Sequence, residues 1–493
     1  MQVLDFALTE RVARWRQPPD TAWYQMTLSR VTEGHILQQG RTYFMAQTPT
    51  PPIDATGADE ADLTGVAPRT KAKPSVEKIG DRKLKPSTLM MGHGYDPMLS
   101  EGSLKPPIFA TSTYVFPNAA AGKRHFEGVT GKRPGGSQGL VYSRFNGPNQ
   151  EILEDRLGVW EEAEDALVFS SGMSAIATLM LSMVKPGDTI VHSGPLYAAT
   201  ETLIARILGR FGVQWLDFPA GATREEIDAV MTKAATGNVA LIYLESPANP
   251  TNALVDIQAV RASRDAIFTG ENKPPIAIDN TFLGPLWLKP LEHGAEIVVY
   301  SLTKYAGGHS DLVAGGVLGS KAHINTIRLM RNTIGTICDP NTAWMLMRSL
   351  ETLELRMSRA GENAVKVCAF LRDHPKVERV GYLGFLADTP GMERQADIYA
   401  RHCSGAGSTF SLIVKGGETE AFAFLDALKI AKLAVSLGGT ETLASHPAAM
   451  THLSVSDERK QALGITDNLV RISIGVEDPD DLIADFAQAL DSI

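Results

Sequence analysis

The chain has 493 residues, of which 44% are hydrophobic, and a formal net charge of -9 at pH 7. This length allows large buried cores and two or three domains. The acidic balance gives no general attraction to nucleic acid or to an anionic membrane surface, and no run of about 18 apolar residues indicates a membrane span. Composition therefore favours a globular protein that acts on a small molecule.

The cysteines indicate neither a disulfide framework nor a metal site. Cys338, Cys368 and Cys403 are an odd, widely spaced set without a CxxC pair, so we expect no disulfide, no zinc and no other metal. The N-terminus also lacks the apolar segment of a secretory signal. We therefore expect a cytoplasmic protein.

Residues 1–88 differ in composition from the rest of the chain. They contain a Pro-rich run, Ala46–Pro52, an acidic patch around Asp59–Asp62 and a basic stretch from Arg69 to Lys85. Such a segment buries little apolar surface, so we expect a mobile extension, with Met45 as an alternative start. The basic stretch is interpreted as a solvated or subunit-contacting arm, and a macromolecular partner is the alternative.

From residue 150 onwards, predicted helices and strands alternate. We expect helices at 150–162, 174–184, 200–211, 224–235 and 256–268, and strands at 166–169, 189–192, 213–218, 239–244, 276–278 and 296–300. This alternation predicts an α/β fold with a mostly parallel sheet covered by helices on both faces.

The pattern changes after Gly319. A long amphipathic helix is predicted over 342–357, followed by strands at 409–414 and 469–474 and helices at 418–428 and 479–490. These shorter elements predict an α+β C-terminal domain.

Three chemically active side chains fall at predicted strand ends. Glu245, Asp279 and Lys304 each follow an apolar strand, and ligands of parallel sheets bind at the carboxyl ends of the strands. Burial there would disfavour the charged form of Lys304 and free its amine to attack a carbonyl, which is Schiff-base chemistry. A solvated lysine at a strand exit is the alternative.

A glycine turn after the strand at 166–169 indicates a phosphate site. The N–H groups of Gly172 and Met173 open a helix and could bind a phosphate, although an ordinary glycine turn has the same pattern. Ser301 and Thr303 could add hydroxyl groups. Asp279 is a carboxylate suited to a pyridinium nitrogen, and its alternative role is to cap a turn or helix.

These motifs carry a resemblance to a known family. In order they are Ser170-Ser-Gly-Met, Pro195-Leu-Tyr, Glu245-Ser-Pro-Ala-Asn-Pro-Thr, Asp279-Asn-Thr, Ser301-Leu-Thr-Lys-Tyr, Ser436-Leu-Gly-Gly, His446-Pro-Ala-Ala-Met-Thr-His and Val470-Arg-Ile-Ser-Ile-Gly-Val-Glu-Asp. From about Leu89 to Ile493 the chain resembles the cystathionine γ-synthase/γ-lyase family of transsulfuration enzymes, which depend on pyridoxal 5'-phosphate (PLP). The resemblance implies the aspartate-aminotransferase-like fold type I.

The resemblance also implies roles for individual residues. Lys304 would bind PLP covalently, Asp279 would pair with its ring nitrogen, and Tyr197 would stack on the ring. The other expected contacts are Gly172, Met173, Ser301 and Thr303 at the phosphate, joined by Tyr142 and Arg144 from a neighbouring subunit, Asn249 at the 3-oxygen, Thr281 at the cofactor, and Ser436 and Arg471 at the substrate carboxylate.

The implied organisation follows from these contacts. We expect an arm over 89–150 that contacts the neighbouring subunit, a PLP-binding large domain over 151–330 and the α+β domain over 331–493. A homodimer would complete each site, and a tetramer is the expected assembly.

The implied chemistry is loss of a γ-substituent from an amino-acid substrate. The freed Lys304 would remove the Cα proton and then act at Cβ, while Tyr197 would protonate the leaving group or only stack on the ring.

Three departures from the family pattern bear on the substrate. Phe145–Asn149 changes the cross-subunit loop, and Ala198 and Ala199 replace the Gly-Cys of methionine γ-lyases. Ala-Val precedes Ser436 where members that handle cystathionine resemble Ala-Glu-Ser. The missing cysteine argues against a methionine γ-lyase, whereas the apolar Val435 argues for one.

The leading hypothesis is γ-elimination or γ-replacement on a sulfur amino acid or an O-acylhomoserine, with a methionine or cystathionine γ-lyase favoured. A cystathionine γ-synthase or O-acylhomoserine sulfhydrylase is the alternative. A non-catalytic PLP-binding protein is a further alternative, but it would not require Lys304, Asp279, Tyr197 and Arg471 together.

Overall fold

The computed structural model describes residues 76–130, 132, 139–270, 273–453 and 455–493. Most of the predicted extension and most of the glycine-rich loop at 135–139 therefore lie outside the described residues. Residues 76–83 contain an exposed hairpin of β1 (Lys78–Ile79) and β2 (Arg82–Lys83), followed by α1 (Pro86–Leu89) and the 3₁₀ turn η1 (Pro97–Leu99). The arm at 106–116 contains no helix or regular strand.

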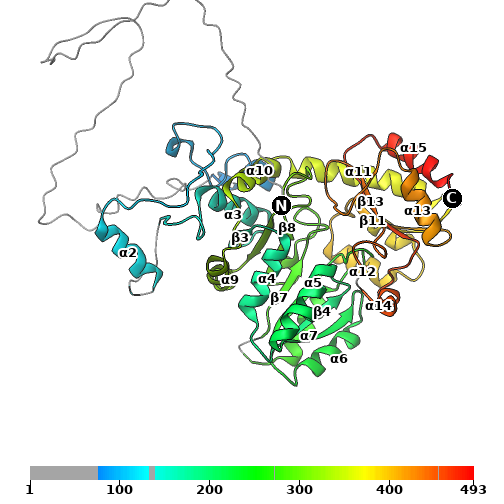
Figure 1. The fold of residues 1–493 in the computed structure, drawn as a ribbon, viewed down its shortest axis with the longest axis horizontal. Coiled ribbons are helices and arrows are strands. Elements are labelled where there is room, and N and C mark those ends of the chain that lie inside the picture. Colours follow the sequence, from blue (N-terminus) through cyan, green and yellow to red (C-terminus); the bar gives the residue numbers. More distant parts are fainter. Residues whose placement is uncertain (1–75, 131, 133–138, 271–272, 454) are drawn as a thin grey trace, which may run out of the picture. The chain divides into compact units, whose positions relative to one another are not determined.

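The largest sheet has seven strands in the order β3-β9-β8-β7-β6-β4-β5 (Figure 1). Their bounds are β3 (Asp165–Phe169), β4 (Thr189–Gly194), β5 (Gln214–Pro219), β6 (Val239–Glu245), β7 (Ile276–Asp279), β8 (Ile297–Ser301) and β9 (Gly315–Gly319). β9 alone among these runs antiparallel to its neighbours, β3 and β8. The prediction of a mostly parallel α/β sheet is confirmed.

The sequence did not predict strand β9, because three of its five residues are glycine, a residue depleted in strands. The glycines are needed for close packing. A Cβ on Gly315 would lie 2.2 Å from the carbonyl oxygen of Ser171, and one on Gly319 would lie 2.6 Å from that of Glu296. β9 can therefore pack against the start of α4 and the start of β8 only without side chains at these positions.

Alternate residues of the central strands face two different cores. In β6, Leu241 and Tyr243 belong to one buried cluster, whereas Ile242 and Leu244 belong to the other. The helices divide in the same way. α4 (Gly172–Met183) and α9 (Lys321–Ile334) pack in the first cluster, and α3 (Pro148–Glu161), α6 (Arg224–Ala234), α7 (Ile257–Ile267) and α10 (Pro340–Leu350) pack in the second.

The predicted helix at 200–211 is less regular than expected. It consists of α5 (Ala198–Thr202), a π-helical turn (Leu203–Ile207) and a 3₁₀ turn (Leu208–Phe211), which ends where Gly212 adopts a φ of 80°. The remaining short helices of this region are α2 (Ala119–Val129) and α8 (Pro290–His293). None of the helices in the described part of the chain is long and apolar enough to cross a membrane.

A second sheet contains five strands in the order β10-β11-β14-β13-β12. The strands are β10 (Val377–Gly381), β11 (Thr409–Val414), β12 (Lys432–Leu433), β13 (Leu443–Ser445) and β14 (Leu469–Ser473). Helices α13 (Glu418–Ala427) and α15 (Pro479–Leu490) pack with it in a third core, and η4 (Leu383–Asp388) and α14 (Asp457–Ala462) lie in its connections. This is the α+β arrangement that the sequence predicted.

The single helix predicted over 342–357 is wrong, because the chain breaks between α10 and α11 (Leu353–Arg372). Polar side chains stabilise the break. The carbonyl oxygen of Ser349 accepts hydrogen bonds from Arg356 Nη2 at 2.9 Å and Thr352 Oγ1 at 3.3 Å. The apolar spacing continues through the break, which is why periodicity did not reveal it.

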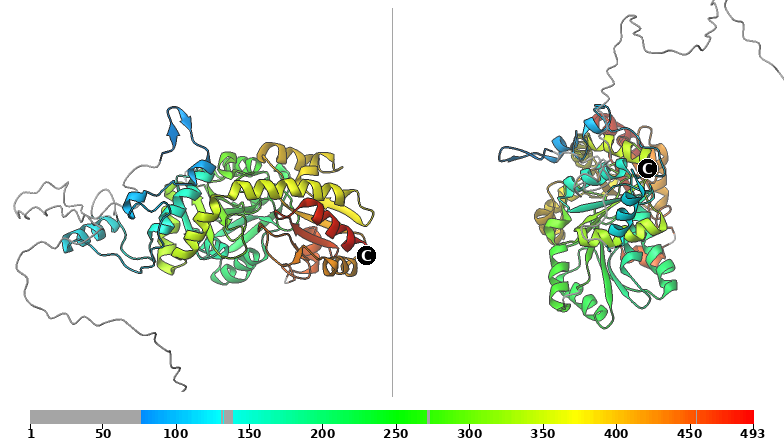
Figure 2. Two further views of the ribbon diagram at one scale, coloured as in Figure 1. Left: turned by 90° about the horizontal axis from the view of Figure 1, so that it is seen from above. Right: turned by 90° about the vertical axis from the view of Figure 1, so that its left-hand side faces the viewer.

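Helix α11 connects the cores of the two sheets (Figure 2). Leu353 and Met357, in its first turns, are buried in the core beside the large sheet, whereas Val367 and Leu371 are buried in the C-terminal core. One rigid helix thus contributes to both.

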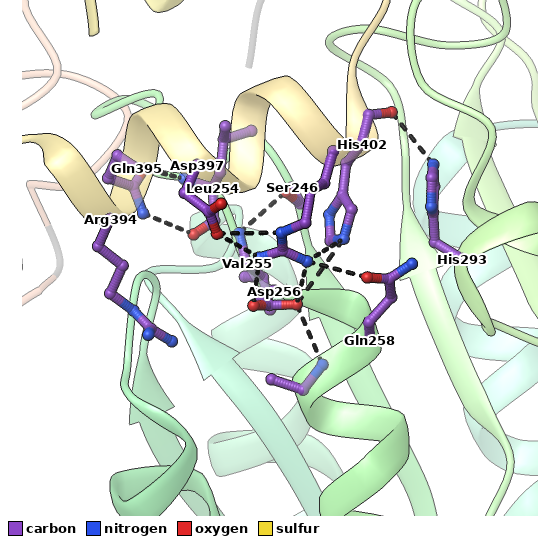
Figure 3. A network of polar contacts seen from close by, with 12 residues as sticks. Ser246, Leu254, Val255, Asp256, Gln258, His293, Arg394, Gln395, Asp397 and His402 are labelled. Carbon is purple, nitrogen blue, oxygen red and sulfur yellow. Dashed lines mark hydrogen bonds and ion pairs between the residues drawn. The ribbon is translucent and has the colours of Figure 1, made fainter. Parts of the chain in front are cut away.

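Helix α12 (Glu393–His402) forms a polar contact with the large-sheet region (Figure 3). The amide of Gln395 accepts from Leu254 N at 2.6 Å and donates to Leu254 O at 2.9 Å. Arg401 Nη2 donates to Asp256 Oδ2 at 2.7 Å, and His402 Nε2 lies 3.7 Å from Asp256 Oδ1. These contacts fix the chain that follows β6 against the C-terminal region.

The stability of this contact depends on pH through His402. Burial, and then the neighbouring His293, lowers the pKa of His402 to about 4, against the favourable charge of Asp256. The unfolded chain binds this proton near pH 6.5. The free energy of unfolding therefore decreases as the pH falls from about 6.5 to about 4. The decrease is at most about 1.4 kcal/mol per pH unit, the value for one proton.

We expect His402→Gln to reduce the loss of stability over this pH range. The measurement is urea unfolding of the wild type and the variant from pH 7 to pH 4, with His374→Gln, a change at a half-buried histidine, as the control. If the free energy of unfolding falls equally with pH in the wild type and in His402→Gln, His402 is not the group responsible.

Candidate active site

A cavity of about 240 Å³ lies at the carboxyl ends of β6, β7 and β8. Both sheets contribute to it, since Arg471 of β14 also lines it. Eleven of the predicted site residues line the cavity: Gly172, Met173, Tyr197, Asn249, Asp279, Thr281, Ser301, Thr303, Lys304, Val435 and Arg471. The structure therefore brings together side chains that are far apart in the sequence.

Lys304 follows β8 by one tight turn, in which its N–H donates to Ser301 O at 3.2 Å. Its Nζ donates to Ser436 Oγ at 3.0 Å, so the predicted Ser436 contacts the lysine amine. Burial, and then the positive charge of Arg471, lowers the pKa of Lys304 to about 8. A minor fraction of neutral amine, about a tenth at pH 7, is therefore present.

The start of α4 forms one wall of the cavity. Ser171 caps the helix by accepting from Ser174 N at 2.9 Å, which leaves the first N–H groups, those of Gly172 and Met173, without partners inside the helix. A Cβ on Gly172 would lie 3.0 Å from Ser301 Cβ, so a larger residue would force this turn and the end of β8 slightly apart. Such a turn suits an anion.

Hydroxyl groups surround the same turn. Thr281 Oγ1 accepts from Ser301 N at 2.9 Å, and Thr303 Oγ1 donates to Ala314 O at 3.2 Å. These bonds orient the residues after β7 and β8. The roles predicted for Ser301, Thr303 and Thr281 at a cofactor stay predictions.

Two buried carboxyl groups lie side by side at the ends of β6 and β7. Glu245 and Asp279 are paired in register, and burial raises the pKa of both. Asp279 Oδ1 accepts from Thr281 N at 3.0 Å. A cation against Asp279 would stabilise its ionised form. Glu245 was not among the predicted site residues, although its position at a strand end already distinguished it.

Arg471 is buried where the two sheets meet. Its Nη1 donates to Asn249 Oδ1 at 3.0 Å and its Nη2 to Ser436 O at 3.0 Å, while Nε has no partner among the described residues. Burial lowers the pKa of Arg471 to about 10, which leaves it cationic at neutral pH. An unpaired donor on a buried guanidinium is suited to a carboxylate.

An apolar wall faces these polar groups, and most of it was missed by the sequence analysis. Besides Val435, which is 59% exposed, it contains Val313, which is 60% exposed. The other residues not predicted are Ser171, Ile176, Pro247, Phe282 and Leu437. The apolar ones give no chemical signal, although Ser171, Pro247 and Leu437 lie within the quoted motifs and Phe282 directly follows one.

Tyr142 and Arg144 do not line the cavity of their own chain. Both are exposed, and the guanidinium of Arg144 lies 4.8 Å from the ring centroid of Phe145 and donates to Asn332 O. Their predicted role in the site of a neighbouring subunit stays a prediction. Within the described residues, no three His, Cys, Asp or Glu side chains gather as a metal site.

Comparison with known proteins gives a consistent result. The family model for Cys/Met metabolism PLP-dependent enzymes matches residues 87–491. The chain is 38% identical to L-methionine γ-lyase of Pseudomonas putida, over 82% of this chain and 96% of that protein. It is 36% identical to cystathionine γ-lyase of Bacillus subtilis, over 83% of this chain and 100% of that protein.

Solved structures agree with these relatives. The crystal structure of cystathionine γ-lyase from Lactobacillus plantarum in complex with L-serine is similar with a TM-score of 0.73 and 31% identity, covering 83% of this chain and 99% of that chain. The motifs, the fold and the cavity all point the same way as these similarities. The chain belongs to the Cys/Met metabolism family of PLP-dependent enzymes.

Proposed function

We propose that the protein is a PLP-dependent lyase that eliminates the γ-substituent of a sulfur amino acid, preferably one with an uncharged substituent such as methionine. The observation that carries this proposal is the half-buried Lys304 amine, which shares one cavity with Asp279 and Arg471. These three groups supply a base, a partner for a cationic ring and a partner for a carboxylate.

The residues of the cavity fit PLP. The turn at Gly172 and Met173, with Ser301 and Thr303, suits its phosphate, while Asp279 suits its ring nitrogen, and Tyr197, Asn249 and Thr281 line the remaining space. When bound, PLP supplies an electron-poor ring that stabilises negative charge at the substrate Cα.

The chain's own groups would orient the substrate and move protons. Asn249 and Ser436 orient the guanidinium of Arg471 by accepting from its Nη atoms. Its unpaired Nε would then bind the α-carboxylate of the substrate. Lys304, whose pKa is about 8, takes the Cα proton and returns one at a later step. The hydroxyl group of Ser436 keeps Nζ in position at 3.0 Å. Tyr197 is the candidate proton donor to the leaving group.

The apolar wall supports an uncharged leaving group. Val435 and Val313 both present methyl groups to the cavity, and the carboxylates that line it, in the part of the chain that the structure describes, are the buried Glu245 and Asp279. A distal ammonium group would thus lose hydration without gaining a partner at this wall.

A second copy of the chain would complete the site with its Tyr142 and Arg144. The exposure of apolar residues on the arm supports an oligomer: Met98 is 75%, Leu104 78% and Val115 93% exposed. A dimer is the smallest assembly that serves this purpose, and a tetramer is the expected one.

A substrate panel tests the function. Purified protein with PLP is offered methionine, homocysteine, cystathionine, O-acetylhomoserine and O-succinylhomoserine, and 2-oxobutanoate and thiol are measured. We expect both products from methionine, and a loss of at least about 100-fold in turnover in Lys304→Ala, the low end for removing a general base. Product that forms only when a second thiol substrate is added would contradict a lyase and favour a synthase.

Val435→Glu tests the apolar wall. The new carboxylate can pair with a distal ammonium, so the ratio of kcat/KM for cystathionine to that for methionine should rise roughly 10- to 150-fold. This corresponds to about 1.5–3 kcal/mol, the range for a hydrogen bond to a charged group. Val435→Gln is the control, because it has the same length without the charge. An unchanged ratio in Val435→Glu, or a wild type that already prefers cystathionine strongly, would show that Val435 does not set the preference.

Arg144→Ala tests the shared site. Removing a charged phosphate contact should weaken PLP retention, and each variant alone should be nearly inactive. Mixing Arg144→Ala with Lys304→Ala protein and allowing subunits to exchange should restore part of the activity, because one mixed site then has both wild-type residues. Exchange without recovery would contradict the arrangement.

A further inference from the structure

We propose that Glu245 is a positioning residue that holds Tyr197 and Asn249 in one fixed geometry, by accepting a backbone hydrogen bond from each. The functional part of this inference rests on the proposed roles of Tyr197 and Asn249 at the cofactor.

The carboxylate of Glu245 bridges two loops that leave neighbouring strands. Oε2 accepts from Tyr197 N at 2.7 Å, on the loop after β4, and Oε1 accepts from Asn249 N at 2.9 Å, on the loop after β6. The backbone pairing of β4 and β6 ends at His192 and Tyr243. Beyond that point Glu245 N donates to Ser193 Oγ at 3.0 Å, and the Glu245 side chain links the two loops that follow the strands.

Both loops carry a side chain that the cavity uses. Tyr197 lines the cavity on one side, and Asn249 Oδ1 accepts from Arg471 Nη1 at 3.0 Å on the other. A movement of either backbone N–H would displace the phenol ring or the amide that orients Arg471. Glu245 thereby fixes the distance between the ring-contacting side and the carboxylate-binding side of the site.

A carboxyl group suits this position. It offers acceptors on both oxygens, whereas a glutamine has one acceptor and an NH2 group that would face a backbone N–H. The ionised form is expensive here, because Glu245 is 5% exposed and lies beside Asp279, and both effects raise its pKa. The two backbone donors act in the opposite direction and lower it. The pKa nevertheless stays raised well above its usual value, so the bridge rests on the geometry of the two backbone hydrogen bonds.

Hydrogen exchange of the PLP-free protein tests the bridge without any catalytic step. In Glu245→Gln, the amide of Tyr197 or Asn249 loses its acceptor, so exchange in peptides covering 193–203 or 246–253 should accelerate at least about tenfold. The control is Asp485→Asn, which alters another buried carboxylate, one that accepts from the backbone N–H groups of Lys429, Ile430 and Ala431, none of which lines the cavity. It should change exchange only near those residues.

Two further measurements connect the bridge to the site. With PLP bound, Glu245→Gln should keep its visible absorption but change its visible circular dichroism, which reports the asymmetric surroundings of the ring. Its kcat/KM should fall about 100-fold, as expected for a misplacement of about 1 Å, while Asp485→Asn stays within about threefold of the wild type. If Glu245→Gln does not fold, Glu245→Asp, which is too short to reach both loops, replaces it and should expose one of the two amides.

The proposal is overturned if exchange and circular dichroism of the Glu245 variant match the wild type, or if Asp485→Asn loses as much kcat/KM at an equal fall in Tm. A wild type inactive on the whole substrate panel would refute the proposed function instead, and the exchange result would still decide the role of Glu245.

Discussion

The removal of Lys304 from water is the constraint on which the rest of the site depends. Lys304 is half-buried because β8 carries the chain out of the core directly into the cavity, and this burial lowers the pKa of its amine. Ser436 accepts a hydrogen bond from this amine, and burial together with the positive charge of Arg471 lowers its pKa to about 8. Chemistry at Lys304 thus requires both the large sheet and the C-terminal sheet to be in place.

Contacts that join the large-sheet region to the C-terminal region therefore affect the site. Helix α11 enters both cores, and the network of Gln395, Arg401 and His402 fixes residues 254–256, only a few positions after Asn249. Glu245 fixes the same loop from the other side. The geometry of the cavity therefore results from contacts well outside it, and variants far from Lys304 can change activity through the loop that carries Asn249.

Much of the fold could be predicted from the sequence because it depends on local patterns. The alternation of apolar strands and helices predicts the sheet, and polar residues directly after strands predict Asp279 and Lys304. What failed depends on tertiary contacts. β9 pairs through glycines, the break after Leu350 is stabilised by Arg356, and Val313 reaches the cavity without any chemical signature. The cross-subunit role of Tyr142 and Arg144 involves a second chain and stays a prediction.

The most direct measurement is to locate the residue to which PLP attaches. The PLP-loaded protein is reduced with borohydride, digested and sequenced by mass spectrometry, so that the covalently modified lysine is identified. The account predicts stoichiometric modification of Lys304, at the end of β8, and of no other lysine. Modification of a different lysine, or none with PLP demonstrably bound, would contradict it.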